Sequence, residues 1–171
     1  MEIKKIYSAN IYLDGTNSLL GKASQITLPD IVASVDTHQA LGMIGKVELP
    51  SGLDMLTTKI KWSSFWPDRI AMGADPFTAH KIQVRASVET YGVNGRIAED
   101  PLVALLAVRF KKTPLGALMS QTNPEVEDEL ATTYVKVSVA GKELVEIDMM
   151  NNVWRSNGVD VLAKYRANLG L

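Results

Sequence analysis

The sequence contains no cysteine and only two histidines. Disulfide bonds, thiolate nucleophiles and thiolate metal sites are therefore excluded. The two histidines, His38 and His80, lie far apart in the sequence, so a histidine-rich metal site is not indicated. Neither charge dominates, because 18 basic residues face 19 acidic ones and the formal net charge is −1. No overall field draws the protein to nucleic acid or to an anionic membrane.

Long hydrophobic runs are also missing. The longest, Leu102–Val108, is far too short to span a bilayer, and we expect no membrane anchor. The N-terminus passes directly from Lys4 and Lys5 into alternating residues, which argues against a signal peptide. With 171 residues and a hydrophobic fraction of 46%, the sequence predicts one soluble globular domain over residues 1–171.

The dominant hydrophobic period is two, which indicates half-buried β-strands. The clearest example is His80–Glu89, where apolar residues alternate with polar ones. Residues 3–13 alternate as well, with Tyr7, Ala9, Ile11 and Leu13 expected on one face. Turn signals at Asp14-Gly15 and Ala140-Gly141 predict two hairpins, whose returning strands are Ser18–Leu28 and Glu143–Asp148. Leu53–Trp62 is a further predicted strand, and Leu102–Val108 is predicted to be buried on both faces.

Two short helices and one long loop complete the prediction. Proline, an early acid and a terminal glycine predict a helix over Pro67–Gly73. A second helix is predicted near the C-terminus, with Asn157 as its cap. The segment Thr113–Thr133 is the least regular and is interpreted as a loop. The predicted fold class is mainly β with short helices (α+β).

Residues that could carry catalysis give little support for an enzyme. His80 lies on the apolar face of its strand, which favours a hydrogen-bonded core or interface histidine over a ligand or base. Glu146 and Asp148 share a face at strand spacing, about 7 Å apart, but two charges on a wetted strand explain them better than a glycosidase pair. We expect no catalytic residue, no metal and no cofactor.

Two further patterns have simple explanations. The acidic run Glu125–Glu129 lacks the ligand spacing of an EF-hand and is interpreted as a solvated charge run. Gly42–Lys46 misses the spacing of a phosphate-binding loop and is interpreted as a flexible loop. The tryptophans Trp62, Trp66 and Trp154 are not interleaved with basic residues, so we expect core or subunit-contact anchors.

A longer motif lies near the C-terminus. Gly141–Asp148 reads as a turn glycine followed by a "KELVEID" strand, and Asn157–Asp160 supplies "NGVD". The chain then ends in Asn168-Leu169-Gly170-Leu171. These blocks, with the opening Asn10–Gly15 and later Gly52–Met55, resemble the tail tube family of contractile-tailed bacteriophages, often called FII. The chain departs from the family at Lys112–Met119, which is more apolar than the usual connector.

The resemblance implies an antiparallel β-barrel or sandwich with a flanking helix that forms hexameric rings. Stacked rings would form the inner tube of a contractile tail, assembled in the host cytoplasm and carried in the virion. Its partners would be the sheath protein, the baseplate and terminator proteins at the tube ends, and the tape measure protein and then DNA inside. The tube would guide DNA through the host envelope.

Two sets of residues are hypothesised to serve this assembly. A lumen-facing strand would present polar side chains to the channel, namely Lys81, Gln83, Arg85, Ser87 and Glu89. Ring and stacking contacts are assigned to the N-terminal strand and to Leu41–Leu53, with the specific residues Ile11, Leu13, Gly42, Met43, Gly45, Gly52 and Leu53. The alternatives are the tube of a bacteriocin or secretion system without DNA passage, a small enzyme on a β-barrel, and a monomeric binding module.

Overall fold

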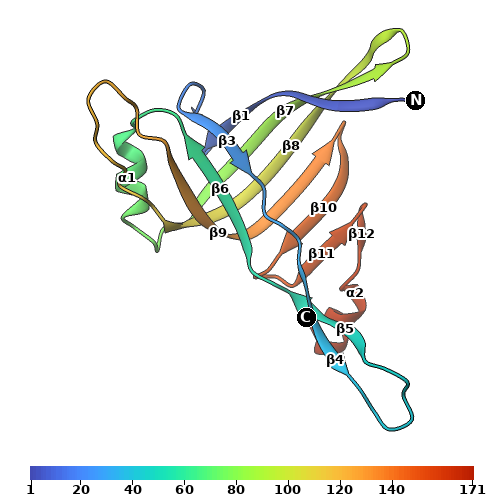
Figure 1. Ribbon diagram of the computed structural model, residues 1–171. Coiled ribbons are helices and arrows are strands. Elements are labelled where there is room, and N and C mark those ends of the chain that lie inside the picture. Colours follow the sequence, from blue (N-terminus) through green and yellow to red (C-terminus); the bar gives the residue numbers. More distant parts are fainter.

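The computed structural model describes residues 1–171, and one antiparallel sheet of ten strands dominates it (Figure 1). Its main path runs β12-β11-β10-β9-β8-β7-β1-β2, while β3 and β6 branch from β9 through the β6–β9 pairing. The strands of this sheet are β1 (Ile3–Leu13), β2 (Asn17–Ser18), β3 (Ala23–Thr27), β6 (Leu56–Trp62), β7 (His80–Gly92), β8 (Gly95–Lys112), β9 (Val126–Val139), β10 (Lys142–Asp148), β11 (Val153–Ser156) and β12 (Val159–Asp160).

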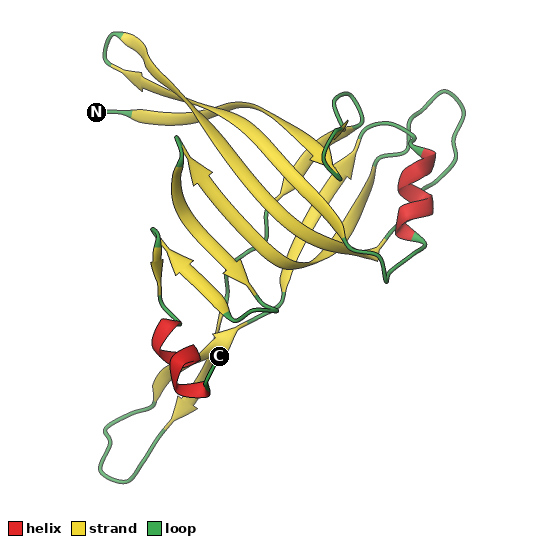
Figure 2. Cartoon of the chain, turned by 180° about the vertical axis from the view of Figure 1, so that it is seen from behind, coloured by secondary structure: helices red, strands yellow, loops and turns green.

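The branch at β9 makes the sheet curl over itself. The first half of β9 pairs with β6 and the second half with β10, while β8 runs along its other edge. The inner faces of the two branches therefore turn toward each other, as the curved strands of Figure 2 show. The mainly β, antiparallel fold is confirmed, but the ladder ends at β2, β3 and β12 without closing into a barrel.

The core fills the concave side of this sheet. Alternate residues of β6, β7 and β8 point inward, as the strand period requires. A fully buried Val, Leu, Ile, Phe or Met side chain stabilises a fold by about 1.5–3 kcal/mol. The core cluster comprises Ile11, Leu13, Leu19, Leu56, Ile60, Trp62, Ile82, Val84, Ala104, Leu106, Val108, Phe110, Val126, Leu130, Val135 and Ile147.

A bulge in β1 changes which residues face the core. Ile6 pairs with Val88 and Ser8 with Ser87, so Tyr7 is the extra residue. The bulge shifts the alternation by one position, and Tyr7 is 70% exposed. The prediction that Tyr7 shares the face of Ile11 is therefore wrong, because a strict period of two does not reveal an inserted residue.

Two predicted strands differ from the structure. Ser18–Leu28 is not one returning strand, because β2 pairs with β1 over two residues and β3 pairs with β6 instead. The segment Leu102–Val108 belongs to the much longer β8, where Ala104, Leu106 and Val108 are buried but Leu105 is 38% exposed. Burial on both faces is therefore not achieved within one subunit.

The predicted loop Thr113–Thr133 is wrong beyond residue 125. The strand β9 begins at Val126 because the acidic residues have partners on both neighbouring strands. Glu127 contacts Lys59 at 3.6 Å, and Glu129 contacts Lys112 at 3.3 Å. The sequence did not reveal this strand, because its acidic residues suggest exposure to water until lysines of the neighbouring strands are seen to pair with them.

The helices are short. The structure confirms α1 (Pro67–Gly73) with proline in its first turn. In contrast, α2 spans only Ala163–Leu169, and Asn157 does not cap it. Asn157 and Gly158 both have positive φ and form the two-residue turn that joins β11 to β12, as a type I′ hairpin requires. With seven residues each, neither α1 nor α2 has the length of a membrane-crossing helix.

The remaining strands, β4 (Ala33–His38) and β5 (Val47–Leu53), pair only with each other. This ribbon extends from the body at one end, while the start of β1 and the β7–β8 turn extend at the opposite end (Figure 1). We call these extensions the ribbon (residues 33–53) and the arm (residues 3–8 and 87–101). Most of both extensions lies outside the packed core, although Leu53 at the base of the ribbon packs against it and Val88 of the arm is buried.

Candidate assembly surfaces

The ribbon exposes hydrophobic side chains on a two-stranded hairpin that no third element covers. Leu41 and Ile44 at its tip are fully exposed, and Leu49 in β5 is 52% exposed. An isolated two-stranded hairpin is at best marginally stable in water. The base of the ribbon is held at the body by Leu53, so the uncovered apolar surface lies toward its tip.

The predicted contact residues of this segment all lie on the ribbon. Gly42 and Gly45 belong to the loop between β4 and β5, and Gly52 and Leu53 lie at the end of β5. Gly42 has a φ of +83°, which L side chains rarely adopt. Met43 is 36% exposed beside them. The structure thus brings these five residues onto one extension, and their role in contacts stays a prediction.

The other two predicted contact residues lie elsewhere. Ile11 and Leu13 are 6% and 3% exposed and pack in the subunit's own core. The alternation of apolar and polar residues placed them on an apolar face, but it did not reveal whether the subunit's own core or a neighbouring copy covers that face. The exposed large apolar residues of β1 are instead Ile3, Ile6 and Tyr7, at its beginning.

The arm has an open backbone edge. Along residues 3–11, β1 pairs with β7 on one side, and its only other strand partner is β2 at residues 12 and 13. Residues 95–100 of β8 likewise pair only with β7, because the pairing with β9 begins at Leu102 and the carbonyl of Pro101 already accepts from the N–H of Ala140. Unpaired N–H and C=O groups on such edges accept another strand readily. Nearby apolar side chains, including Val93 at 92% exposure, add to this surface.

The predicted lumen-facing residues share the convex face of the sheet. Lys81, Gln83, Arg85 and Ser87 alternate with the buried Ile82 and Val84, so their side chains point away from the core. Their neighbours across to β8 are Ala107, Leu105, Val103 and Pro101. The orientation agrees with the alternation, whereas contact with a lumen stays a prediction.

Glu89, the fifth predicted lumen residue, is only 3% exposed. Tyr91 donates a hydrogen bond of 2.7 Å to its carboxylate, and Arg96 donates one of 2.5 Å. These two bonds lower the pKa of Glu89, that of Tyr91 contributing most. Glu89 therefore serves a local polar cluster at the base of the arm's turn.

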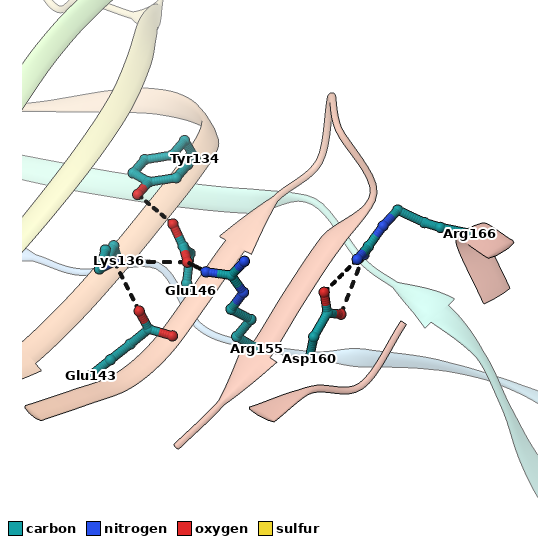
Figure 3. A network of polar contacts seen from close by, with 7 residues as sticks. All are labelled: Tyr134, Lys136, Glu143, Glu146, Arg155, Asp160 and Arg166. Carbon is teal, nitrogen blue, oxygen red and sulfur yellow. Dashed lines mark hydrogen bonds and ion pairs between the residues drawn. The ribbon is translucent and has the colours of Figure 1, made fainter. Parts of the chain in front are cut away.

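A polar network covers the convex face of β9, β10 and β11 (Figure 3). Glu146 accepts a hydrogen bond from Tyr134 at 2.8 Å and one from Arg155 at 2.9 Å. Lys136 lies 2.8 Å from Glu143 and 3.8 Å from Glu146. Burial, followed by the bond to Glu146, raises the pKa of Tyr134 to about 12. Glu146 and Asp148, the two carboxylates considered as a possible catalytic pair, therefore have different partners. Glu146 belongs to this network, while Asp148 accepts from the backbone N–H groups of Met150 and Asn151.

His80 is held in the interior, as the sequence favoured. It is 8% exposed, its Nδ1 lies 2.8 Å from Asp14 Oδ2, and its ring meets Phe110 edge-on at 5.6 Å between centroids. Asp14 also accepts from the backbone N–H of Lys81 at 2.8 Å. The pair therefore fastens the turn after β1 to the beginning of β7. No group of three or more potential metal ligands occurs in the structure.

A curled sheet with open edges and an uncovered apolar ribbon defines a class of protein that assembles through its own surfaces. A family model described as phage tail tube protein FII matches residues 3–170. The chain is 29% identical to the tail tube protein of Escherichia phage P2 over 98% of each chain. It is 24% identical to the major tail tube protein of Serratia phage KSP20 over 91% of this chain and 88% of that relative. The chain belongs to the phage tail tube protein FII family, and it is a structural tail tube protein of phages.

Proposed function

We propose that this chain forms the inner tube of a contractile phage tail as stacked hexameric rings. The tube guides DNA through the host envelope and has no catalytic activity. The observation that carries the proposal is the uncovered ribbon on a chain whose family is that of phage tail tubes. Assembly takes place in the host cytoplasm, and the assembled tube belongs to the virion.

Ring closure uses the open edges of the arm. When one surface patch of each copy meets a different patch of the next, the contact repeats until the rotation closes. The edge of β1 at residues 3–10 and the edge of β8 at residues 95–100 are two such different patches of one subunit. Pairing between copies satisfies backbone groups that the single chain leaves open, so this contact adds hydrogen bonds as well as apolar burial.

Stacking uses the ribbon. It extends from the body at the end opposite the arm (Figure 1), which suits contact with a neighbouring ring. Burial of apolar surface is worth roughly 25 cal/mol per Å². The exposed side chains of Leu41, Ile44 and Leu49 supply such surface, and Gly42 allows the tight tip between them.

The convex face lines the channel. Its acidic residues are mostly held by basic residues of the same subunit, as in the pairs Lys136–Glu143 and Arg155–Glu146. On β9, β10 and β11, where the basic residues are held in this way, fewer cations are free to retain the DNA backbone than on an unpaired basic surface, which suits passage. The sheath protein contacts the outside of the tube, baseplate and terminator proteins contact its ends, and the tape measure protein and then DNA occupy the lumen.

Negative-stain electron microscopy of the purified chain tests this proposal. We expect the chain to form tubes with an axial channel at high concentration. The double variant Leu41→Ser/Ile44→Ser should stay folded and lose stacking, because both side chains lie at the ribbon tip. Leu118→Ser, which changes an 85% exposed residue of the loop before β9, is the control and should form tubes. Isolated, non-stacking particles of the unmodified chain at every concentration would contradict the proposed function.

A further inference from the structure

An apolar groove lies at the end of the curled sheet where the ribbon leaves the body. It runs between the end of β5, the strands β10 and β11, and the segment that leads into α2. Its volume is about 740 Å³, within the range of protein binding sites. We call it the end groove. The apolar side chains that line it include Leu53, Ile147, Trp154, Val161, Leu162 and Tyr165.

The helix beside the end groove does not close it. None of the residues of α2 is buried, and Tyr165 is 51% exposed on the groove. Val161, which also lines the groove, is 52% exposed. The helix is held instead by polar contacts, in which Arg166 binds Asp160 and the carbonyl of Asn152. The end groove therefore leaves apolar surface open to a further polypeptide.

A narrow apolar tip lies at the other end of the subunit. The turn between β7 and β8 reads Gly92-Val93-Asn94-Gly95, and we call these four residues the arm turn. Val93 is 92% exposed. Because both residues that flank Val93 and Asn94 are glycines, the arm turn presents a single apolar side chain on a thin backbone. Such a tip can enter a groove between two walls.

Head-to-tail stacking brings the arm turn and the end groove together. Figure 1 shows β5, β11 and α2 at the ribbon end and the arm at the opposite end. When all copies of a stack point the same way, the ribbon end of each ring faces the arm end of the next. The two extensions have similar lengths, since Gly95–Leu102 of β8 covers about 23 Å and Val47–Leu53 of β5 about 20 Å. An arm that lies beside a ribbon therefore reaches the ribbon's base.

We propose that the end groove receives the arm turn of a copy in the adjacent ring, with Val93 among its apolar side chains. Ser51 and Asn152 also line the groove and offer hydrogen bonds to Asn94 and to the backbone of the turn. Since Leu53 belongs to both the ribbon and the groove, the contact continues the surface that the ribbon uses for stacking. It rests on the proposed function, in which rings stack, but it adds a binding site distinct from the ribbon tip and from the open edges of the arm.

Other occupants fit the end groove less well. Rotation about the ring axis keeps every copy of one ring at the same height, so the arm turn of a lateral neighbour lies at the end away from the groove. The ribbon tip of the same subunit extends away from the body (Figure 1). Proteins at the tube ends reach only the grooves of a terminal ring, whereas stacking supplies an arm turn for every groove inside the tube.

Paired cysteines test the contact, because the chain contains no cysteine of its own. Tubes of the variant Val93→Cys/Val161→Cys are oxidised and separated by non-reducing electrophoresis. A disulfide requires Cα atoms within about 7 Å, so two positions at opposite ends of a subunit can react only between copies. We expect a ladder that continues beyond the number of subunits in one ring, because each bond joins successive rings. Val93→Cys/Leu118→Cys is the control and should give no ladder.

The variant Val93→Ser measures the strength of the contact. It should raise the protein concentration needed for tube formation about tenfold, which corresponds to about 1.4 kcal/mol. Leu20→Ser, which changes a 76% exposed residue of the turn between β2 and β3, should leave that concentration unchanged. Adding Tyr165→Ser to Val93→Ser should have little further effect, because both changes remove the same contact. Circular dichroism and thermal unfolding establish that each variant is folded.

The outcomes separate this contact from the proposed function. Tubes of the double-cysteine variant without a ladder would overturn the contact alone, and a ladder that stops at the size of one ring would assign the groove to a lateral neighbour. Unchanged tube formation by Val93→Ser would remove the arm turn from the stack. If Val161→Cys does not fold, Ser51→Cys on the β5 side of the groove replaces it. Without tubes, disulfide-linked dimers in concentrated solution would support the contact and defeat the proposed function, whereas the absence of both would defeat both.

Discussion

Arg69 and Asp128 are 59 positions apart in the sequence and form a buried ion pair, with Arg69 Nη1 donating to Asp128 Oδ1 at 2.7 Å. Neither residue is more than 3% exposed. Trp62 donates to the other carboxylate oxygen at 2.8 Å, and Arg69 also donates to the carbonyl of Pro114 at 2.9 Å. Burial raises the pKa of Asp128, while Arg69 and Trp62 oppose that shift. These contacts attach α1 and the loop between β8 and β9 to the end of the curled sheet.

Removal of one partner from this pair should destabilise the subunit strongly. Asp128→Asn leaves the guanidinium of Arg69 buried without its counter-charge, at an expected cost of about 3–5 kcal/mol. Chemical denaturation measures the loss. Glu129→Gln breaks the exposed pair with Lys112 and should cost under about 1 kcal/mol. Similar losses for the two variants would show that burial does not control the energy of the pair.

A glycine of α1 should resist enlargement because the helix approaches the loop closely. A Cβ added at Gly73 would lie 2.2–2.6 Å from three side-chain atoms of Thr113, including its Cβ. Gly73→Ala should therefore destabilise the fold by about 1–3 kcal/mol, as overpacking does. Gly92→Ala is the matched control, since its nearest neighbour would lie at 3.4 Å, and denaturation should find it nearly neutral.

Among the tyrosines of the chain, we expect Tyr134 to titrate near pH 12. Its pKa of about 12 lies above the ordinary value of 10.0, so the folded state binds the proton more tightly than the unfolded state. The stability that this phenol contributes is fully present below pH 10 and declines as the pH rises toward 12. Ultraviolet titration should show Tyr134→Phe without the highest step. Persistence of that step would assign it to another tyrosine.

The C-terminal helix should depend on the ion pair of Asp160 and Arg166. Arg166 binds the carboxylate of Asp160 and donates to the carbonyl of Asn152 at 2.8 Å, which fixes α2 beside β12. The pair lowers the pKa of Asp160, so its contribution is present at neutral pH and is lost as the pH falls through that lowered value. In hydrogen exchange, Arg166→Gln should reduce the protection of α2 at pH 7. Lys164→Gln, which changes a neighbouring cation, should not.

The amino-acid sequence by itself determined most strands, because a side chain's face follows directly from the two-residue period. It placed His80–Glu89 on β7, the Ala140-Gly141 turn between β9 and β10, and the helix Pro67–Gly73. The family motif near the C-terminus was equally readable, since it depends on residue order alone.

Only the tertiary structure decided which partner each face and charge meets. The strand within Thr113–Thr133 forms where Lys59 and Lys112 lie beside its acidic residues. Asp128 is buried because Arg69, from a helix distant in the sequence, pairs with its carboxylate. Likewise, Ile11 entered the core whereas Tyr7, four residues earlier, was displaced outward by a bulge. The alternation of apolar and polar residues predicts which face of a strand a side chain occupies. Burial and ion pairing depend on neighbours that the chain brings together only by folding.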